Sequence, residues 1–240
     1  MPTSACCCGN WKRRNARFGG DLRPDDRTDA RVKRHDRHGR ALAIALAIVA
    51  GYVDAIGFLG LGGYFVSFMS GNTTRAAVGV VRYAGMATFG FALIASFVAG
   101  VVAGSLLAEA TDERRKSATL VLAAGILAVA AVIGHFRVAG LVLVPAAMGA
   151  TNAVFQRDGQ VSIGVTYMTG TLVRFGQHVA GALRGGDRLG WLPYLLLWLG
   201  LLGGGILGTT LYPFVGVSGL LLAVIAYLGL AWAAPRAVES

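Results

Sequence analysis

Asp54 is the residue whose type and position point most clearly to chemistry. It is the only acidic residue within the apolar segments set out below. In a helix that begins at Ala41 it would lie about 20 Å from the start, past the middle of a ~30 Å hydrocarbon layer. A carboxylate at that depth is costly and usually faces a polar pathway or a partner. We therefore predict a proton- or cation-binding role for Asp54; the alternative is a structural pair with Ser/Thr hydroxyls or with Arg75.

Two similar segments supply further polar candidates. Residues 66–75 read VSFMSGNTTR and residues 165–174 read VTYMTGTLVR, so valine, methionine, glycine and arginine recur at a spacing of 99 residues. A second pair of blocks, GYVDAI and GATNAV, lies upstream of each segment at a spacing of 98 residues. These blocks match Asp54 with Asn152, which lacks the charge, so the two half-sites are not equivalent. The chain therefore contains an internal repeat.

The composition of segments 66–75 and 165–174 favours broken or re-entrant helices. Unwound backbone survives at membrane depth only where protein or a watery cavity covers it. The alternative is a pair of interfacial loops with tight glycine turns. Asn72 and Thr171 are candidates to coordinate an ion or to cap a half-helix, and Arg174 is expected to extend to the interface. The residues predicted to line a substrate or ion pathway are Asp54, Ser70, Gly71, Asn72, Arg75, Asn152, Thr169, Gly170 and Thr171.

The composition requires a membrane-embedded scaffold for these candidates. Of the 240 residues, 55% are hydrophobic and 14% are charged, whereas a soluble domain carries roughly 25% charged residues. A soluble domain with this composition would have too little polar surface to face water. A soluble globular enzyme is therefore excluded, and the sequence predicts an all-α, multi-pass protein in contact with the lipid bilayer.

Apolar stretches of about 20 residues are long enough to cross a bilayer. Pro145 falls inside the fourth stretch and is expected to kink it, and Pro213 lies in the joint after the fifth, where a helix must stop. An alternative with eight spans adds residues 63–83 and 160–180, the second of which is too polar. The six predicted spans are residues 41–62, 84–108, 117–135, 138–156, 191–211 and 214–234.

The distribution of Lys and Arg predicts the orientation. With six spans and a cytoplasmic N-terminus, the outer loops hold only Arg75, Arg82 and Arg137. The chain is therefore predicted to lie in the cell membrane with both termini in the cytoplasm. Residues 1–40, which hold 11 Lys and Arg and 5 acidic residues, are predicted to form a disordered basic tail. Three adjacent cysteines in this tail, Cys6–Cys8, cannot build a disulfide framework.

The repeat divides the membrane part into residues 41–135 and residues 138–234. Each half holds three predicted spans, so the second half must enter the membrane from the opposite side. Such a 3+3 inverted-topology repeat is typical of secondary transporters, whose sites lie near the bilayer midplane. Glycines at four-residue spacing are predicted to let spans 2 and 5 pack against each other or across a homodimer. These glycines are Gly100, Gly104, Gly200, Gly204 and Gly208.

The blocks around Asp54 also resemble a known family. GYVDAIGF from Gly51, followed by FVSFMSGN from Phe65, is similar to the signature of the YoaK family of small six-span bacterial membrane proteins. The resemblance covers about residues 41–234. It implies the six-span fold and a small transporter without a defined substrate, and it implies no catalytic residues.

Two classes of function are compatible with these patterns. The first is a small secondary transporter or permease for an unknown small solute or ion, with a midplane site at the repeat interface. The second is a non-transporting membrane sensor or scaffold. An enzyme is not expected, because a single acid in the spans is available for chemistry. Neither a cofactor nor a metal site is expected, since no nucleotide-binding, nucleophile-elbow or zinc pattern occurs. Nucleic acid is not an expected partner, because much of the basic charge belongs to the tail.

Overall fold

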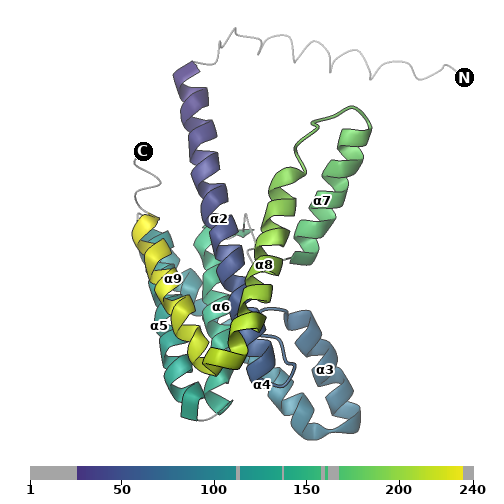
Figure 1. Cartoon of the computed structure of the whole chain (residues 1–240), viewed down its shortest axis with the longest axis vertical. Helices are drawn as coiled ribbons and strands as arrows, with labels where there is room; N and C mark the ends of the chain where they lie inside the picture. Colours follow the sequence, from purple (N-terminus) through teal and green to yellow (C-terminus); the bar gives the residue numbers. More distant parts are fainter. Residues whose placement is uncertain (1–25, 112–113, 137, 158–159, 162–167, 235–240) are drawn as a thin grey trace, which may run out of the picture. The chain divides into compact units, whose positions relative to one another are not determined.

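The computed structural model describes residues 26–111, 114–136, 138–157, 160–161 and 168–234. Apart from connections, these residues are helical, with one two-residue antiparallel pair of strands, β1 (Gln156–Arg157) and β2 (Gln160–Val161). The chain divides into two units, residues 1–36 and residues 37–240. In the first unit the described residues are helical, and all packing considered below lies in the second unit (Figure 1).

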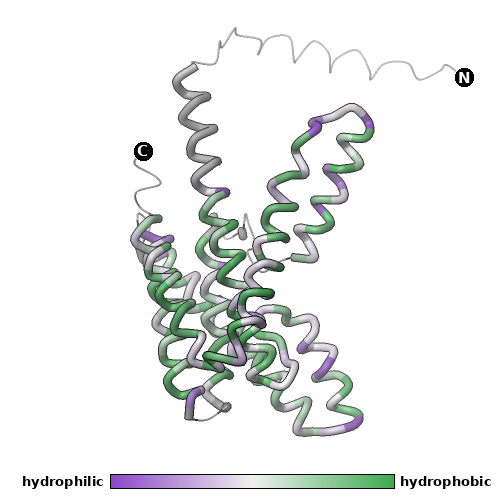
Figure 2. The backbone as a smooth tube through the Cα atoms, in the orientation of Figure 1, coloured by the Kyte–Doolittle hydropathy of each residue, from purple (hydrophilic) through white to green (hydrophobic). Residues whose placement is uncertain are grey.

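Four stretches of described helix are long and apolar enough to cross a membrane. They lie in α2 (Asp26–Gly60), α4 (Ala84–Ala110), α5 (Arg115–Phe136) and the joined pair α8 (Leu192–Val215) and α9 (Leu220–Ala233). Figure 2 shows hydrophobic residues along most of their length. The predicted all-α, multi-pass membrane protein is confirmed. The stretches themselves are Gly39–Gly60, Ala84–Ala110, Arg115–His135 and Leu192–Ala233.

Helix α2 begins earlier than predicted. It starts at Asp26, inside the segment 1–40 that was expected to be disordered, and ends at Gly60. No glycine or proline separates Pro24 from Gly39, and elongating an existing helix avoids the cost of nucleating a new one. The apolar helix therefore continues backwards into the charged sequence. Residues 1–25, including Cys6–Cys8, lie outside the described residues.

The fourth predicted span, residues 138–156, is not a single α-helix. It is divided into η3 (Val138–Leu143), α6 (Val144–Asn152) and η4 (Ala153–Phe155), and its apolar helical part is shorter than a span. Pro145 lies in the first turn of α6, where the missing N–H breaks no intrahelical bond. The expected kink at Pro145 was therefore wrong: the chain changes from 3₁₀ to α geometry there.

The joint between α8 and α9 depends on glycine rather than on proline. Helix α8 continues through Pro213 to Val215 and does not stop at residue 211. Gly216 has φ of 55°, a conformation that favours glycine, and begins η5 (Gly216–Gly219). Figure 1 shows α8 and α9 diverging from this joint. The sequence predicted a joint at residues 212–213, whereas it lies a few residues later, at Gly216–Gly219.

Two segments that were expected to be broken are regular short helices. Helix α3 (Met69–Arg82) and helix α7 (Met168–Leu183) start at equivalent methionines of the repeat. The glycines of the two motifs, Gly71 and Gly170, therefore lie in first helical turns and not in tight glycine turns. Neither helix is among the stretches long enough to cross a membrane. In Figure 1, α3 and α7 lie at opposite ends of the helical bundle, with α3 low and α7 high.

The predicted packing glycines lie at two close helix crossings. A Cβ atom on Gly100 of α4 would overlap the carbonyl oxygen of Ala146 in α6. A Cβ atom on Gly204 of α8 would overlap the carbonyl oxygen of Ile48 in α2. Close contact between backbones requires residues without side chains at these positions. The structure thus pairs α4 with α6 and α8 with α2, and not α4 with α8 as in the first of the two predicted arrangements; the second, packing across a homodimer, stays a prediction.

The two crossings use equivalent residues of the repeat. Ala146 follows Ile48 by the same 98 residues that separate Gly149 from Gly51. Gly149 in turn faces the carbonyl oxygen of Phe97, and Gly51 faces that of Leu201. Along each crossing the residue numbers rise together on both helices, so α4 runs parallel to α6 and α8 parallel to α2. Each crossing therefore joins one helix from each half of the chain.

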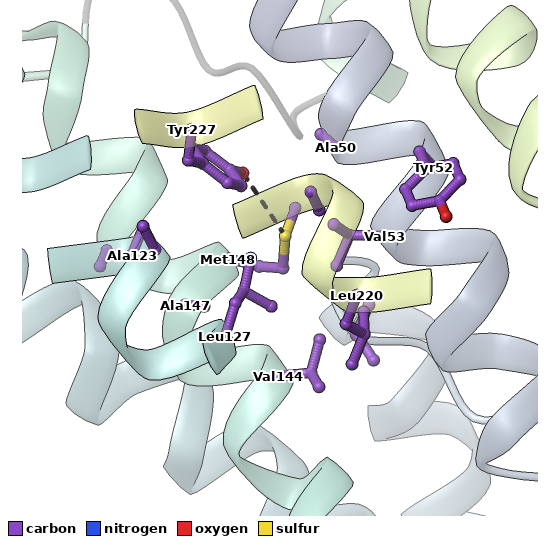
Figure 3. Close-up of a cluster of buried hydrophobic side chains, with 14 of the residues drawn as sticks. Ala50, Tyr52, Val53, Ala123, Leu127, Val144, Ala147, Met148, Leu220 and Tyr227 are labelled. Carbon is purple, nitrogen blue, oxygen red and sulfur yellow. Dashed lines mark hydrogen bonds between the residues drawn. The ribbon is translucent and has the colours of Figure 1, made fainter. Parts of the chain in front are cut away.

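Helices α5 and α9 form a third contact between the halves, and they run antiparallel. The Ser117 hydroxyl donates to the Ala231 carbonyl oxygen over 2.8 Å, which joins the start of α5 to the end of α9. His135 Nδ1 lies 3.3 Å from Ser218 Oγ, near the end of α5 and the start of α9. Figure 3 shows the core beside this pair, where Tyr227 of α9 meets Met148 of α6.

Candidate functional site

Asp54 lies past the middle of the apolar stretch Gly39–Gly60 of α2, six residues before the helix ends. Its Oδ2 accepts a hydrogen bond from the hydroxyl of Ser67, which belongs to the connection between α2 and α3. Its Oδ1 is buried and has no hydrogen-bond partner within the part of the chain that the structure describes. The residue as a whole remains partly exposed. A carboxyl group with one partner and one unpartnered buried oxygen is the chemical centre of the candidate site.

Glycines at the end of α2 turn the chain back toward Asp54. Gly62 and Gly63 have φ of 61° and 92°, and the Gly63 N–H donates to the Phe58 carbonyl oxygen over 2.7 Å. This bond is typical of helix ends closed by a residue with positive φ. Val66 then packs, fully buried, against Gly57. The next residue in the chain is Ser67, whose hydroxyl reaches Asp54.

Asn72 holds the same connection from the other side. Its Oδ1 accepts from the Phe65 N–H over 3.0 Å, and its Nδ2 donates to the Phe65 carbonyl oxygen over 2.7 Å. Asn72 is fully buried, and the rings of Phe65 and Phe68 cover Gly71. Asn72 and Gly71, both predicted to line the pathway, therefore act as supports of the loop that carries Ser67.

Arg75 does not pair with Asp54. Its guanidinium carbon lies 4.7 Å from the centre of the Tyr64 ring, a cation–π contact. The Tyr64 hydroxyl donates to the Met86 carbonyl oxygen at the start of α4 over 3.4 Å. The predicted alternative of an Asp54–Arg75 pair is thus absent among the described residues. Asp54 pairs with a hydroxyl instead, the other structural alternative.

A double-variant cycle checks this separation. We expect Asp54→Asn to keep or raise the melting temperature in detergent, because it removes an ionisable group with few partners. Arg75→Gln should cost up to about 1 kcal/mol, the loss of a cation–π contact. The effects should add within about 0.5 kcal/mol, as for residues without shared partners. A large loss in each single variant that is relieved in the double variant would instead indicate an ion pair.

The equivalent region of the second half is better satisfied. Asn152 Nδ2 donates to the Met148 carbonyl oxygen over 3.0 Å within α6. The Thr151 hydroxyl lies 3.1 Å from the Tyr227 hydroxyl and donates to the Ala147 carbonyl oxygen over 2.8 Å. Tyr227 is fully buried. The segment equivalent to the Ser67 connection, residues 162–167, lies outside the described residues.

The remaining predicted residues lie at the start of the short helices. Ser70 and Thr169 are exposed, Gly170 is half-buried and Thr171 is buried in the first turn of α7. Arg174 is exposed, as expected for an interfacial arginine. The structure therefore brings Asp54 and Ser67 together and leaves Ser70 and Thr169 outside this contact.

Sequence reasoning missed two residues near Asp54. Ser67 was visible in the first motif, where Thr166 takes its place in the second, but it was not selected. Tyr227, within electrostatic range of Asp54, had no signal in the repeat. Among the described residues there is no group of three His, Cys, Asp or Glu side chains that could hold a metal ion. The site is one carboxyl group with hydroxyl neighbours.

Comparison with family models matches residues 42–233 to "Protein of unknown function (DUF1275)". The chain belongs to the DUF1275 family. The match covers α2 from Leu42 to the end of α9 and so contains the whole Asp54 region of this DUF1275 protein. No solved structure matches the DUF1275 chain.

Two relatives of this DUF1275 chain carry the description UPF0700 transmembrane protein. One, from Rhizobium meliloti (strain 1021), is 37% identical over 212 residues, which is 87% of this chain and 92% of the relative. The other is YoaK of Bacillus subtilis (strain 168), 28% identical over 148 residues, or 58% of this chain and 66% of YoaK. The resemblance to the YoaK family is confirmed, and with it an integral membrane protein.

Proposed function

We propose that this DUF1275 protein is a small secondary transporter whose substrate pathway passes Asp54, at an interface between two inverted repeats. The observation that carries the proposal is the buried Oδ1 of Asp54, which has no hydrogen-bond partner among the described residues and lies in a helix long and apolar enough to cross a membrane. Buried polar atoms without partners are costly and rare in structures. Ionisable groups inside membrane spans usually mark the path of a substrate or ion. A side chain that binds and releases a substrate or ion must keep at least one hydrogen-bonding position that the rest of the fold does not fill.

The arrangement of the helices supports an inverted repeat. A Cβ atom on Gly60, at the end of α2, would lie 2.9 Å from Leu141, just before the start of α6. The equivalent helices α2 and α6 therefore run in opposite directions, one ending where the other begins. The same relation between the two halves exchanges the crossing of α4 with α6 for the crossing of α8 with α2. Inverted repeats with a site at their interface are typical of secondary transporters.

Six crossings are proposed, with α6 and its flanking 3₁₀ turns as the fourth and α8 and α9 as the fifth and sixth. Helices α3 and α7 then lie near opposite surfaces. The lysines and arginines in the connections between helices favour an orientation in which the membrane surface near α7 faces the cytoplasm. Both termini then lie on that side. The proposed location is the cell membrane.

Accessibility of single cysteines tests this topology. In a variant without Cys6–Cys8, Tyr83→Cys should react with a membrane-impermeant maleimide added to intact cells, and Arg114→Cys should react only after lysis. Both side chains are exposed in the structure, so that folding does not hide them. In the eight-span alternative the two results would be exchanged.

Reconstitution tests the transport function directly. Proteoliposomes should be screened with Na⁺, K⁺, chloride, amino acids, sugars and small carboxylates, with protein-free liposomes as the baseline. We expect one solute to give flux above this baseline, and Asp54→Asn to lower it more than tenfold. Asp187→Asn, which changes an exposed acid, is the matched control and should keep the flux. Equal flux in wild type and Asp54→Asn would remove Asp54 from the pathway, and no flux in the panel would favour a sensor or scaffold.

A further inference from the structure

We propose that Asp54 and Ser67 form a proton-binding site, so that the coupling ion of the proposed transporter is H⁺ and not a metal cation. That the proton is the coupling ion depends on the proposed transport function, whereas proton binding by Asp54 is argued from the geometry of the site. A hydronium ion protonates a carboxylate oxygen of Asp54: one of its O–H bonds breaks, the O–H bond of the carboxylic acid forms, and a water molecule remains. Release reverses this exchange, and in the proposed transport cycle it occurs to water on the opposite side of the membrane.

The surroundings of Asp54 suit a group that gains and loses a proton. An ionised carboxylate accepts about four hydrogen bonds, and among the described residues only Ser67 supplies any, none of them to Oδ1. The Ser67 hydroxyl can donate to the carboxylate or accept from the carboxylic acid, so it serves both forms. The residue as a whole is half-buried, while Oδ1 itself is enclosed by the protein.

Other charged or titratable groups near the site do not replace the proton. Arg75 of α3 is held over Tyr64, and Tyr227 of α9 has its hydroxyl between Thr151 and Met148. Helices α6 (Val144–Asn152) and α8 (Leu192–Val215) contain no Asp, Glu, Lys, Arg or His, so neither brings an acidic or basic side chain to Asp54. A charge on Asp54 would therefore have no cation to compensate it among the described residues.

A metal cation is a poorer fit than a proton. Sodium sites in inverted-repeat transporters use carbonyl oxygens from unwound helices. Helix α2 is unbroken from Asp26 to Gly60, so the carbonyl groups that α2 itself places beside Asp54 are used in helical hydrogen bonds. The described residues also hold no cluster of acidic or other metal-binding side chains. A proton needs only one oxygen atom to bind, and the carboxyl group of Asp54 can supply it.

The proposed site is mechanically connected to α3. Ser67 lies between Val66, packed on Gly57, and the segment that Asn72 fixes through Phe65. A change in the Asp54–Ser67 hydrogen bond on protonation therefore acts on a short connection that is held at both sides. Through it, the protonation state of Asp54 is linked to the position of the first turn of α3.

Infrared difference spectroscopy of the purified full-length protein in lipid nanodiscs tests the site. A pH step should give a protonated-carboxyl band that is absent in Asp54→Asn and present in Asp187→Asn. In Ser67→Ala the band should remain but shift in frequency, because the carboxyl group loses the hydrogen bond with the Ser67 hydroxyl. The Ser67→Ala result also covers the case in which Asp54→Asn does not fold. A band that survives in folded Asp54→Asn, or a spectrum without such a band in the wild type, would overturn the proposal.

A sodium arm separates the two ions. Replacing choline chloride by sodium chloride at constant ionic strength should leave the band and its pH midpoint unchanged. A midpoint that moves with sodium concentration would mean that Na⁺ competes for Asp54, and would overturn the assignment of H⁺. The spectra require no substrate, so a band assigned to Asp54 together with no flux would refute the transporter and keep the proton site. Flux without the band would refute the proton site and keep the transporter.

Discussion

Gly204→Ala is expected to prevent normal packing of the helical bundle. The added methyl group would overlap the Ile48 carbonyl oxygen of α2, and a second neighbour is the backbone nitrogen of Tyr52. Both are backbone atoms, so relief requires a shift of a whole helix and not a change of rotamer. Overpacking of this kind costs 1–3 kcal/mol and occasionally more. We expect about 3 kcal/mol or more, measured as a lower melting temperature and a smaller monodisperse fraction in detergent.

The adjacent glycine is the matched control. A Cβ atom on Gly203 has nothing within 4 Å, so Gly203→Ala should be neutral or stabilise by up to about 1 kcal/mol through helix propensity. Gly100→Ala, in the equivalent crossing of α4 with α6, should behave like Gly204→Ala because it meets the Ala146 carbonyl oxygen. Similar melting temperatures for the Gly203 and Gly204 variants would contradict the close crossing of α8 with α2.

Asn72→Ala is expected to have the second largest effect. The variant removes both hydrogen bonds to the Phe65 backbone, so the N–H and the carbonyl group of Phe65 lose these partners. Each buried polar group left unsatisfied costs about 1–3 kcal/mol. We therefore expect a loss of about 2–5 kcal/mol in the free energy of unfolding, measured by chemical denaturation in mixed micelles.

The neighbouring residue again provides the control. Thr73 is exposed and its hydroxyl donates only to the Met69 carbonyl oxygen within α3, so Thr73→Ala should change stability by less than about 0.5 kcal/mol. In addition, Asn72→Ala should disturb the Asp54–Ser67 contact, because the connection is no longer held. An Asn72→Ala variant as stable as Thr73→Ala would mean that Phe65 does not depend on this side chain.

The sequence by itself determined the membrane class, the position of the buried acid and the glycines of the crossings. These features follow from local rules: apolar length for a span, the cost of a charge inside it and the need for small residues where backbones meet. The repeat was also visible, because Asp54 matches Asn152 and Met69 matches Met168 at nearly constant spacing. Such properties do not depend on which helix lies beside which.

Only the tertiary structure decided the partners. Sequence periodicity shows that Gly100 and Gly204 need close neighbours, but many helices could supply them; the packing of the whole bundle selects α6 and α2. In the same way, Arg75 was as plausible a partner for Asp54 as any hydroxyl. The turn at Gly62 and Gly63 brings Ser67 back to the carboxyl group, while Tyr64 holds Arg75 away from it. Contacts between residues distant in the chain depend on these turns and crossings, and no local pattern encodes them.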